Sequence, residues 1–331
     1  MMDNSPEIVI CDLDQDNIDI EKSVFNAAGV SFERLYCKSQ EDIIEQCGSA
    51  TVLMVQYLKI DEEIFKALPT LKMVVRFGVG VDNINLNDAN RYGVQVCNVP
   101  DYGKNEVADH AMALLTSLYR NVWILGQDTK QGNWNLKNGH IVRRPTSMRV
   151  GIVGTGRIGR EFAKRCHAFG FNIIAFDPFY IEHTPENQRL PYISYINTFQ
   201  ELLEQSDILS LHCASTAENY HMMNDGTFSV MKEGSYFINV ARGNLVDEKA
   251  LDRALSSGKL AGAGIDVCEK EPIATDSPLL RQPNCIVTPH TSWYSEEAAQ
   301  QLKHDWAELA VAFVQGQIMD EKYKKNRINN R

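Results

Sequence analysis

The 331-residue sequence predicts an α/β protein with two doubly wound domains, the second inserted into the first. Three observations support this prediction. Short apolar runs rich in β-branched residues alternate with longer amphipathic stretches along almost the whole chain. A glycine-rich turn, GTGRIG, lies near the middle of the chain at residues 154–159. A complete α/β series precedes that turn, and one long amphipathic stretch follows the second series.

The first series predicts five strands, at residues 7–11, 33–36, 52–55, 74–76 and 94–98. Amphipathic helices are expected at 19–28 and 61–67. A single long helix is expected at 104–125, and it is apolar on most faces and therefore buried. The irregular connection at 126–145, which contains Trp134, is longer than an ordinary loop, so we expect it to pack against another surface.

The second series begins at Met148 and predicts strands at 149–153, 172–176, 207–211, 235–239, 261–265 and 284–287. A helix at 295–316 follows. The simplest architecture joins residues 1–101 and 295–331 in one domain and places 102–294 in the other. The basic, polar stretch at 322–331 is expected to be a solvated terminus.

Composition excludes several classes of protein. The net charge of −10 argues against nucleic acid or an anionic membrane as the main partner. No stretch approaches the roughly 20 apolar residues of a membrane helix, and no secretory signal is expected. Eight single cysteines without a CxxC pair predict reduced thiols in a cytoplasmic protein. His110 follows Glu106 at a metal-binding spacing, but no further ligands accompany them, so no metal is expected.

The glycine turn has the full context of a dinucleotide fingerprint. A predicted strand leads into the turn, a helix follows it, and the next strand ends at Asp177. Glycines suit the tight turn, the close approach of a pyrophosphate and the packing of the helix, whose N-terminus attracts phosphates. Asp177 can accept both adenosine ribose hydroxyls and would repel a 2′-phosphate, so NAD is favoured over NADP. The turn residues are Gly154, Thr155, Gly156, Arg157, Ile158 and Gly159.

Three further clusters, at residues 239–247, 266–272 and 288–295, each follow a predicted strand, where open α/β sheets bind ligands. Together with GTGRIG, FGVGVDN at 77–83 and NVPDYGKNEVAD at 98–109, they resemble the D-isomer-specific 2-hydroxyacid dehydrogenase family. The resemblance covers nearly the whole chain. Within that family the chain is most similar to the C-terminal-binding-protein (CtBP-like) branch, through CNVP at 97–100, LVDEKAL at 245–251 and PHTSWYSEEA at 289–298.

The resemblance implies the fold and the catalytic roles. The expected fold is two Rossmann-like or flavodoxin-like doubly wound domains, with the NAD-binding domain inserted in a discontinuous substrate-binding domain. His290 would be the general acid, and Glu271 would hold its imidazole and favour the protonated form. Arg242 would bind the substrate carboxylate and polarise the carbonyl.

Further contacts are implied position by position. Asp266 would accept from the nicotinamide carboxamide, and Ala214-Ser215-Thr216 departs from the family's usual Pro-Leu-Thr. Trp293 would pack on an apolar or thioether side chain of the substrate, or serve only as a hinge residue. Arg76 would reach a second polar group of the substrate, or pair with a carboxylate. The other implied cofactor contacts are Val107, Cys213, Asn219, Val240 and Ala241, and the other substrate contacts are Gly78, Val79 and Gly80.

The expected activity is NAD-dependent interconversion of a small 2-oxo acid and its D-2-hydroxy acid, by a homodimer that uses residues 104–145 as an arm. Glyoxylate or hydroxypyruvate reduction and phosphoglycerate oxidation stay open. So does an NAD(H)-sensing regulatory protein, although such a sensor would not require Arg242, Glu271 and His290. An L-specific lactate or malate enzyme is disfavoured, because in those enzymes the fingerprint lies near the N-terminus.

Overall fold

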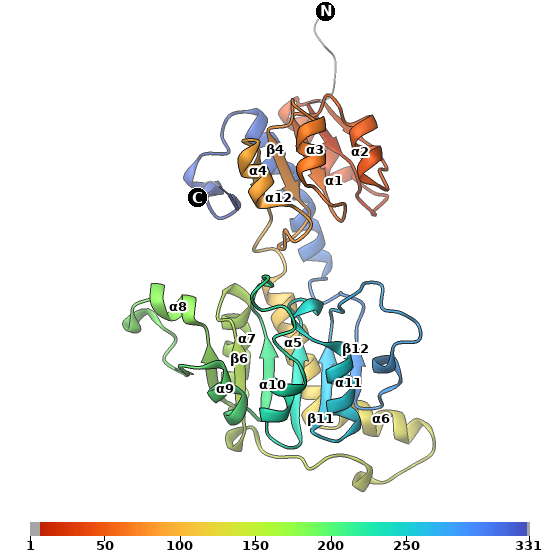
Figure 1. The fold of residues 1–331 in the computed structure, drawn as a ribbon, viewed down its shortest axis with the longest axis vertical. Helices are drawn as coiled ribbons and strands as arrows, with labels where there is room; N and C mark the ends of the chain where they lie inside the picture. The colour runs from red at the N-terminus through yellow and green to blue at the C-terminus, as the bar shows by residue number, and fades with distance from the viewer. Residues whose placement is uncertain (1–6, 330–331) are drawn as a thin grey trace, which may run out of the picture. The chain divides into compact units, whose positions relative to one another are not determined.

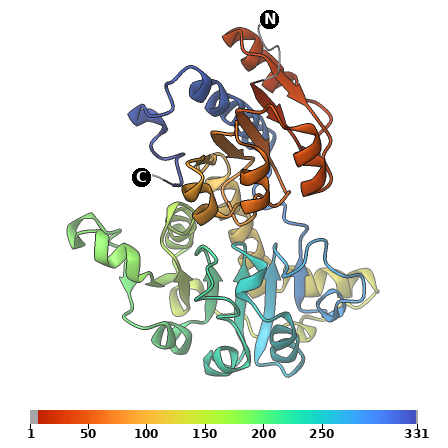
Figure 2. The same cartoon turned by 45° about the horizontal axis from the view of Figure 1, so that its top comes forward.

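The computed structural model describes residues 7–329, which divide into two compact units. The first unit comprises Met1–Tyr102 and Ser295–Arg331, and the second comprises Gly103–Tyr294. Each unit is one parallel sheet with helices on both faces (Figures 1 and 2), which confirms the predicted α/β class. Within the described residues, no helix has the length and apolar character needed to span a membrane.

The sheet of the first unit has the order β2-β1-β3-β4-β5, and every pairing is parallel. The order reverses between β1 and β3, which is the position where open α/β sheets commonly bind ligands. The strands are β1 (Ile8–Ile10), β2 (Phe32–Arg34), β3 (Val52–Val55), β4 (Met73–Arg76) and β5 (Gln95–Cys97).

The helices of the first unit bury apolar stripes on the two faces of this sheet. Ser39 begins one of them with a reciprocal capping box that involves Asp42. The long C-terminal helix lies over β4, where Trp306 is fully buried and donates its indole N–H to the carbonyl of Val75 at 3.0 Å. The helices are α1 (Asp19–Ala28), α2 (Gln40–Gln46), α3 (Glu62–Ala67), α4 (Leu86–Arg91) and α12 (Glu296–Val314).

The basic tail is not the solvated terminus that its composition predicts. Asn329 is only 5% exposed, and its amide oxygen accepts from the backbone N–H of Val96 and the side chain of Gln95, both at 2.7 Å. Its amide nitrogen donates to the carbonyl of Val94 at 2.8 Å. The tail therefore supplies partners to the edge strand β5, although residues 330–331 lie outside the described part of the chain.

The sheet of the second unit has the order β12-β11-β10-β9-β6-β7-β8 and is parallel throughout. Six strands match the predicted ones to within a residue. The short edge strand β8 was not predicted, because three residues offer too little alternation to read. The strands are β6 (Arg149–Val153), β7 (Asn172–Phe176), β8 (Ile193–Tyr195), β9 (Ile208–Leu211), β10 (Ser235–Asn239), β11 (Leu260–Ile265) and β12 (Cys285–Val287).

Two apolar clusters cover the two faces of this sheet. One contains side chains of α5 and α7, and the other contains side chains of α9, α10 and α11. The helices are α5 (Lys104–Tyr119), α6 (Val122–Lys130), α7 (Arg157–Ala168), α8 (Pro178–His183), α9 (Phe199–Gln205), α10 (Asp225–Val230) and α11 (Glu248–Ser256).

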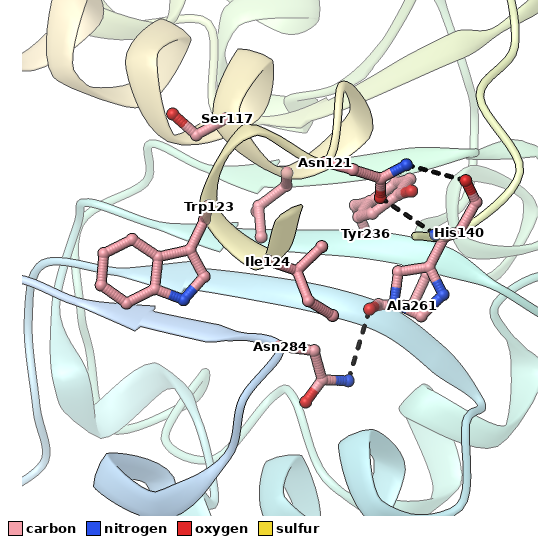
Figure 3. A pocket seen from close by; sticks show the side chains of 9 residues that line it. Ser117, Asn121, Trp123, Ile124, His140, Tyr236, Ala261 and Asn284 are labelled. Atoms are coloured by element: carbon pink, nitrogen blue, oxygen red, sulfur yellow. Dashed lines mark hydrogen bonds between the residues drawn. The ribbon is translucent and has the colours of Figure 1, made fainter. Parts of the chain in front are cut away.

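The single helix expected at 104–125 is instead two helices, because Asn121 adopts a left-handed backbone conformation with φ of 59°. Its amide donates to the carbonyl of His140 at 2.7 Å and accepts from the His140 N–H at 3.1 Å (Figure 3). This clamp fixes the base of an excursion of the chain, which comprises residues 122–142. Trp134 and Leu136 of this excursion are 91% and 83% exposed, so the expectation that it packs against another surface stays a prediction.

Candidate active site

The glycine turn joins β6 to α7 with the backbone that the fingerprint requires. Gly154 has φ of 88°, and a Cβ there would lie 2.9 Å from the backbone nitrogen of Cys213. A Cβ on Gly159 would lie 2.0 Å from the carbonyl oxygen of Gly154, so the start of α7 packs directly on the turn. Gly156 faces open space. Its backbone, with the N–H groups of Arg157 and Ile158 in the first turn of α7, can therefore approach a pyrophosphate.

Asp177 follows β7 and is tied to this turn. Its Oδ2 accepts from the backbone N–H of Thr155 at 2.6 Å and from the Thr155 hydroxyl at 3.0 Å. Its Oδ1 accepts from the Tyr180 N–H at 2.9 Å and so caps α8. The fingerprint acid and the glycine turn thus form one structural group.

The other proposed cofactor contacts lie around the same sheet edge. Cys213 follows β9 beside Gly154, and burial raises the pKa of its thiol to about 11, so it is protonated and unreactive. Asn219 closes its loop by accepting from Thr216 N–H at 2.7 Å and donating to the Ala214 carbonyl at 2.8 Å. Val107 and Val240 are buried in the cluster beneath.

The three proposed catalytic residues follow three neighbouring strands. Arg242 comes after β10, Glu271 after β11 and His290 after β12, and these strands lie side by side. Their carboxyl ends meet at one edge of the sheet, as in the ligand sites of open α/β folds. The structure therefore brings the three clusters to one edge of the sheet, although Arg242 and His290 are 48 residues apart along the chain.

His290 and Glu271 form a close pair, with 2.7 Å between Nδ1 and Oε2. The other carboxylate oxygen accepts from the backbone N–H of Cys268 at 3.0 Å. Burial raises the pKa of Glu271, but the hydrogen bonds from His290 and Cys268, with the charge of Arg242, outweigh it and leave the pKa below its ordinary value. The carboxylate is therefore ionised at neutral pH and holds the imidazole with Nε2 left to act on a ligand.

Arg242 is positioned by a tightly packed turn. Asn239 accepts from the N–H of Ala241 at 3.0 Å and donates to the carbonyl of Arg242 at 2.8 Å, which fixes the backbone before the helical turn Gly243–Leu245. A Cβ on Gly243 would lie 1.9 Å from the backbone of Cys268. The loop that carries Arg242 therefore touches the loop that carries Glu271, which a larger residue would prevent.

Asp266 organises the loop that carries His290. Its side chain is fully buried and accepts from the Thr288 hydroxyl at 2.6 Å and from the N–H groups of Thr291 at 3.0 Å and Ser292 at 2.9 Å. Its carbonyl accepts from the His290 N–H at 2.8 Å. The sequence indicated only a contact of Asp266 with the nicotinamide carboxamide, whereas in the structure this carboxylate holds the turn that carries His290.

Two residues of this network were missed. Nε2 of His110, on α5, lies 3.0 Å from the Thr288 hydroxyl and 3.7 Å from the Asp266 carboxylate. The Thr288 proton is given to Asp266, so His110 must donate through Nε2–H. The sequence offered no signal for this pair, because 178 residues separate its members.

Trp293 is half-buried against the apolar cluster of α5 and α7, and its ring meets that of Tyr294 edge to face. A Cβ on Gly103 would lie 3.2 Å from the Trp293 carbonyl oxygen, so the loop packs on the start of α5. Trp293 therefore has a structural role, because it packs its loop against α5.

The proposed substrate residues of the first unit follow β4. Gly78 has φ of 125°, and Arg76 bends back to donate to the carbonyl of Phe77. Asn98 donates to the carbonyl of Val79 at 2.5 Å and holds the turn that continues to Gly80. The turn lies after β4 at the carboxyl end of the sheet, with Gly78 buried and Val79 exposed.

Sequence reasoning also missed Asp12, which follows β1. Its carboxylate accepts from the N–H groups of Gln56, Tyr57 and Leu58, each at 2.6 Å. Asp14 accepts from the Tyr57 hydroxyl at 3.0 Å. The loop after β3 is therefore fixed by the loop after β1, and an acid directly after a buried strand was the available signal.

Comparisons with known proteins agree with this geometry. The family model described as "D-isomer specific 2-hydroxyacid dehydrogenase, NAD binding domain" matches residues 112–292. A glyoxylate reductase of Korarchaeum cryptofilum is 36% identical over 281 residues, which are 83% of this chain and 82% of that protein. A D-3-phosphoglycerate dehydrogenase of Archaeoglobus fulgidus is 37% identical over 263 residues, 78% of this chain, and the match spans only 49% of its length. A D-lactate dehydrogenase of Aquifex aeolicus, solved with NAD and lactic acid, has a TM-score of 0.86 and 28% identity and covers 97% of this chain and 98% of its own.

Proposed function

This chain belongs to the D-isomer specific 2-hydroxyacid dehydrogenase family of NAD-dependent oxidoreductases, and we propose that it reduces a small 2-oxo acid to the D-2-hydroxy acid. The observation that carries the proposal is the imidazole–carboxylate pair of His290 and Glu271, 2.7 Å apart. Arg242 follows the neighbouring strand, and the glycine turn belongs to the same unit. Reduction of the ketone of a 2-oxo acid needs a proton donor, a cation that binds the carboxylate and a binding site for the hydride donor.

The residues divide the chemistry as follows. Arg242 pairs with the substrate carboxylate and polarises the adjacent carbonyl. His290 gives the proton on Nε2 to the carbonyl oxygen, while Glu271 stabilises the imidazolium beforehand and orients the ring. NADH, when bound, supplies the hydride to the carbonyl carbon. The net reaction consumes one proton and yields the hydroxy acid and NAD.

The second unit offers the groups that NAD requires. The turn at Gly154–Gly159 and the first N–H groups of α7 suit the pyrophosphate. Asp177 suits the adenosine ribose, since Oδ1 accepts one N–H only and keeps a lone pair for a hydroxyl. We assign Asp266, Val107, Val240 and Ala241 to the nicotinamide side. Cys213 and Asn219 are assigned to the loop that borders the adenosine.

We assign residues 102–294 to NAD binding, and 1–101 with 295–331 to substrate binding. In the substrate-binding part, we assign Arg76 and the backbone of Gly78, Val79 and Gly80 to substrate contacts. Trp293, of the NAD-binding part, is assigned to the substrate side chain. A positive φ at Gly78 and the amide of Asn98 support a preformed turn at this position.

Four finer proposals accompany this function. The motif PHTSWYSEEA at 289–298 supports a place in the CtBP-like branch. The exposed apolar excursion at 122–142 supports a homodimer. Eight free cysteines, none with a disulfide, support a cytoplasmic location, and a net charge of −10 argues against nucleic acid and membrane partners.

A panel of 2-oxo acids tests the function. Purified chain is mixed with NADH and glyoxylate, hydroxypyruvate, 3-phosphohydroxypyruvate, pyruvate, phenylpyruvate or 4-methylthio-2-oxobutyrate, and NADH absorbance is followed. The similarity to a glyoxylate reductase and to a D-3-phosphoglycerate dehydrogenase makes glyoxylate and 3-phosphohydroxypyruvate the two acids to test first. We expect turnover of at least one acid, and chiral analysis should show only the D-product.

His290→Asn is the matched control for this panel. It should bind NADH as the parent does and turn over about 10²- to 10⁴-fold more slowly, the usual contribution of a positioned acid. NADH binding without turnover of any acid by the parent would instead favour an NAD(H)-sensing regulatory protein.

A further inference from the structure

We propose that Thr155 and Tyr195 are positioning residues that hold Asp177 in place and so make the site select a dinucleotide without a 2′-phosphate. Both belong to the second unit, and neither was singled out by the sequence for a polar role. The proposal concerns NAD binding alone and does not depend on which 2-oxo acid is reduced.

The hydrogen bonds run in one direction, from Tyr195 through Thr155 to Asp177. An ionised carboxylate only accepts, so the Thr155 hydroxyl, 3.0 Å from Oδ2, gives its proton to Asp177. The Tyr195 hydroxyl, 3.4 Å from the Thr155 oxygen, must then be the donor in their contact. Burial raises the pKa of Tyr195, so the phenol keeps the proton it donates.

The burial of Thr155 indicates that its hydroxyl has a hydrogen-bonding role. Its side chain is completely buried within the glycine turn, where a polar atom costs free energy if it is not hydrogen-bonded. Its backbone N–H and its hydroxyl both bind the same oxygen of Asp177. With the Tyr180 N–H on the other oxygen, three donors fix the carboxylate.

The surroundings of Asp177 explain why the carboxylate must be fixed. Arg160 donates to the Thr155 carbonyl at 2.7 Å, and its guanidinium carbon lies 5.4 Å from the centre of the Tyr180 ring. The guanidinium of Arg189 lies 5.8 Å from the Tyr195 ring centre. These cations would attract a 2′-phosphate. The negative charge of Asp177 opposes that attraction, and it does so fully only if hydrogen bonds keep the carboxylate from rotating away.

The two tyrosine rings complete the support. Tyr180 and Tyr195 stack with 5.7 Å between ring centres and 24° between planes. Tyr180 provides the N–H on one oxygen of Asp177, and Tyr195 supports the hydroxyl on the other. The stacked rings therefore connect the groups that bind the two oxygens of Asp177. Loss of a hydrogen bond at one oxygen should make the position of the whole carboxylate less fixed.

The test is equilibrium binding of NADH and NADPH to the full chain without substrate, followed by nicotinamide fluorescence. Thr155→Val keeps the shape of the side chain and removes the hydroxyl, whereas Thr155→Ser keeps the hydroxyl. We expect Thr155→Val to reduce the ratio of the NADPH Kd to the NADH Kd by about tenfold, the usual effect of one hydrogen bond to a charged group. Thr155→Ser should retain most of the ratio.

Tyr195→Phe gives a second, milder variant, expected to reduce the same ratio about two- to threefold because its hydrogen bond is long. Tyr192→Phe is its control, since Tyr192 stacks on His167 away from Asp177. If Thr155→Val does not fold, Tyr195→Phe decides. Equal weakening of both cofactors, or a serine variant that behaves like valine, would overturn the proposal. The result is independent of turnover, so it is separable from failure of the proposed reduction.

Discussion

Glu271 shows at the scale of one residue how a half-buried carboxyl stays ionised beside a histidine. Burial raises the pKa of its carboxyl, yet the hydrogen bonds from His290 and from the Cys268 N–H leave it lower than its ordinary 4.5. The carboxylate is therefore charged throughout the range in which a histidine exchanges its proton.

Glu271→Gln removes this charge and keeps a hydrogen-bonding side chain. The neutral amide no longer places a negative charge beside the imidazole from which the proton leaves, so kcat/KM at pH 7.5 should fall about 10- to 100-fold. Profiles of rate against 2-oxo acid concentration at pH 7.5 measure this.

Glu269→Gln is the control for that profile. Glu269 binds His221 at 2.7 Å and Tyr220 at 2.8 Å, and not His290. An unchanged kcat/KM in Glu271→Gln would remove the carboxylate from the proposed acid function. The lowered pKa also fixes a stability effect: the stabilisation from this carboxylate is present above pH 4.5 and is lost as pH falls through the folded-state pKa.

The sequence indicated candidate residues for this site but not the hydrogen bonds between them. Glycines, an acid after β7 and three strand-end clusters follow local rules, so GTGRIG, Asp177 and His290 could be proposed as site residues, and their roles stay predictions. The link from His110 to Thr288 could not, because a polar contact over 178 residues leaves no local pattern. The link from Thr155 to Asp177 was hidden in the same way, 22 residues apart.

At the scale of elements, the loops after β10 and β11 act as one unit. The Cβ that Gly243→Ala adds would lie 1.9 Å from the backbone carbon and oxygen of Cys268, and backbone cannot rotate away as a side chain can. The Arg242 and Glu271 loops would separate. We expect kcat/KM to fall at least tenfold and stability to fall by about 1–3 kcal/mol.

Gly226→Ala is the matched control for this change, because the nearest atom to its added Cβ is a side-chain oxygen at 3.2 Å. Kinetics and urea unfolding of both variants should be compared. Full activity in Gly243→Ala would show that the contact of the two loops does not position Arg242.

The edge strand β5 depends on the chain's last described residue. Asn329→Ala removes a side chain that accepts from Gln95 and Val96 and donates to Val94 and Asn90. Buried partners would be left without hydrogen bonds, so the free energy of unfolding should drop by about 2–4 kcal/mol. Urea denaturation measures it, with exposed Asn87→Ala on α4 as control. A loss below about 0.5 kcal/mol, typical of surface sites, would mean the tail is dispensable.

Elements with strong periodicity were predicted, and interruptions set by one residue were not. The strands of both series and α1 follow from alternating or helical patterns. The break between α5 and α6 depends on the left-handed Asn121 and its two bonds to His140, which a continuous apolar pattern conceals. The tail was misread because polarity indicates solvent exposure only when the polar groups lack buried partners.

At the scale of the whole molecule, the chain order explains the two units. The first unit is completed only when α12 returns to cover β4, where Trp306 is buried. The second unit is formed by an uninterrupted segment, Gly103–Tyr294. Alternation of strands and helices, with the glycine turn in the middle, was sufficient to predict this order.

The excursion at 122–142 exposes large apolar side chains, and we propose that a second copy of the chain covers them in a homodimer. Trp134, Leu136 and Ile141 are 91%, 83% and 86% exposed. Large apolar side chains this exposed, on a segment anchored at Asn121, mark an interaction surface more often than a solvated loop. A second copy of this chain brings an identical excursion, so one patch serves both partners under twofold symmetry.

Trp134→Glu combined with Leu136→Glu should convert the dimer to a monomer at micromolar concentration, because two carboxylates would be buried without partners in the interface. Sedimentation velocity of parent and variant measures the mass. Met319→Glu, at a side chain 62% exposed outside the excursion, is the control and should remain dimeric. A parent that sediments as a monomer, or a double variant that stays dimeric, would exclude this surface. NADH affinity should be unchanged in the monomer, because the glycine turn and Asp177 are hydrogen-bonded within one chain.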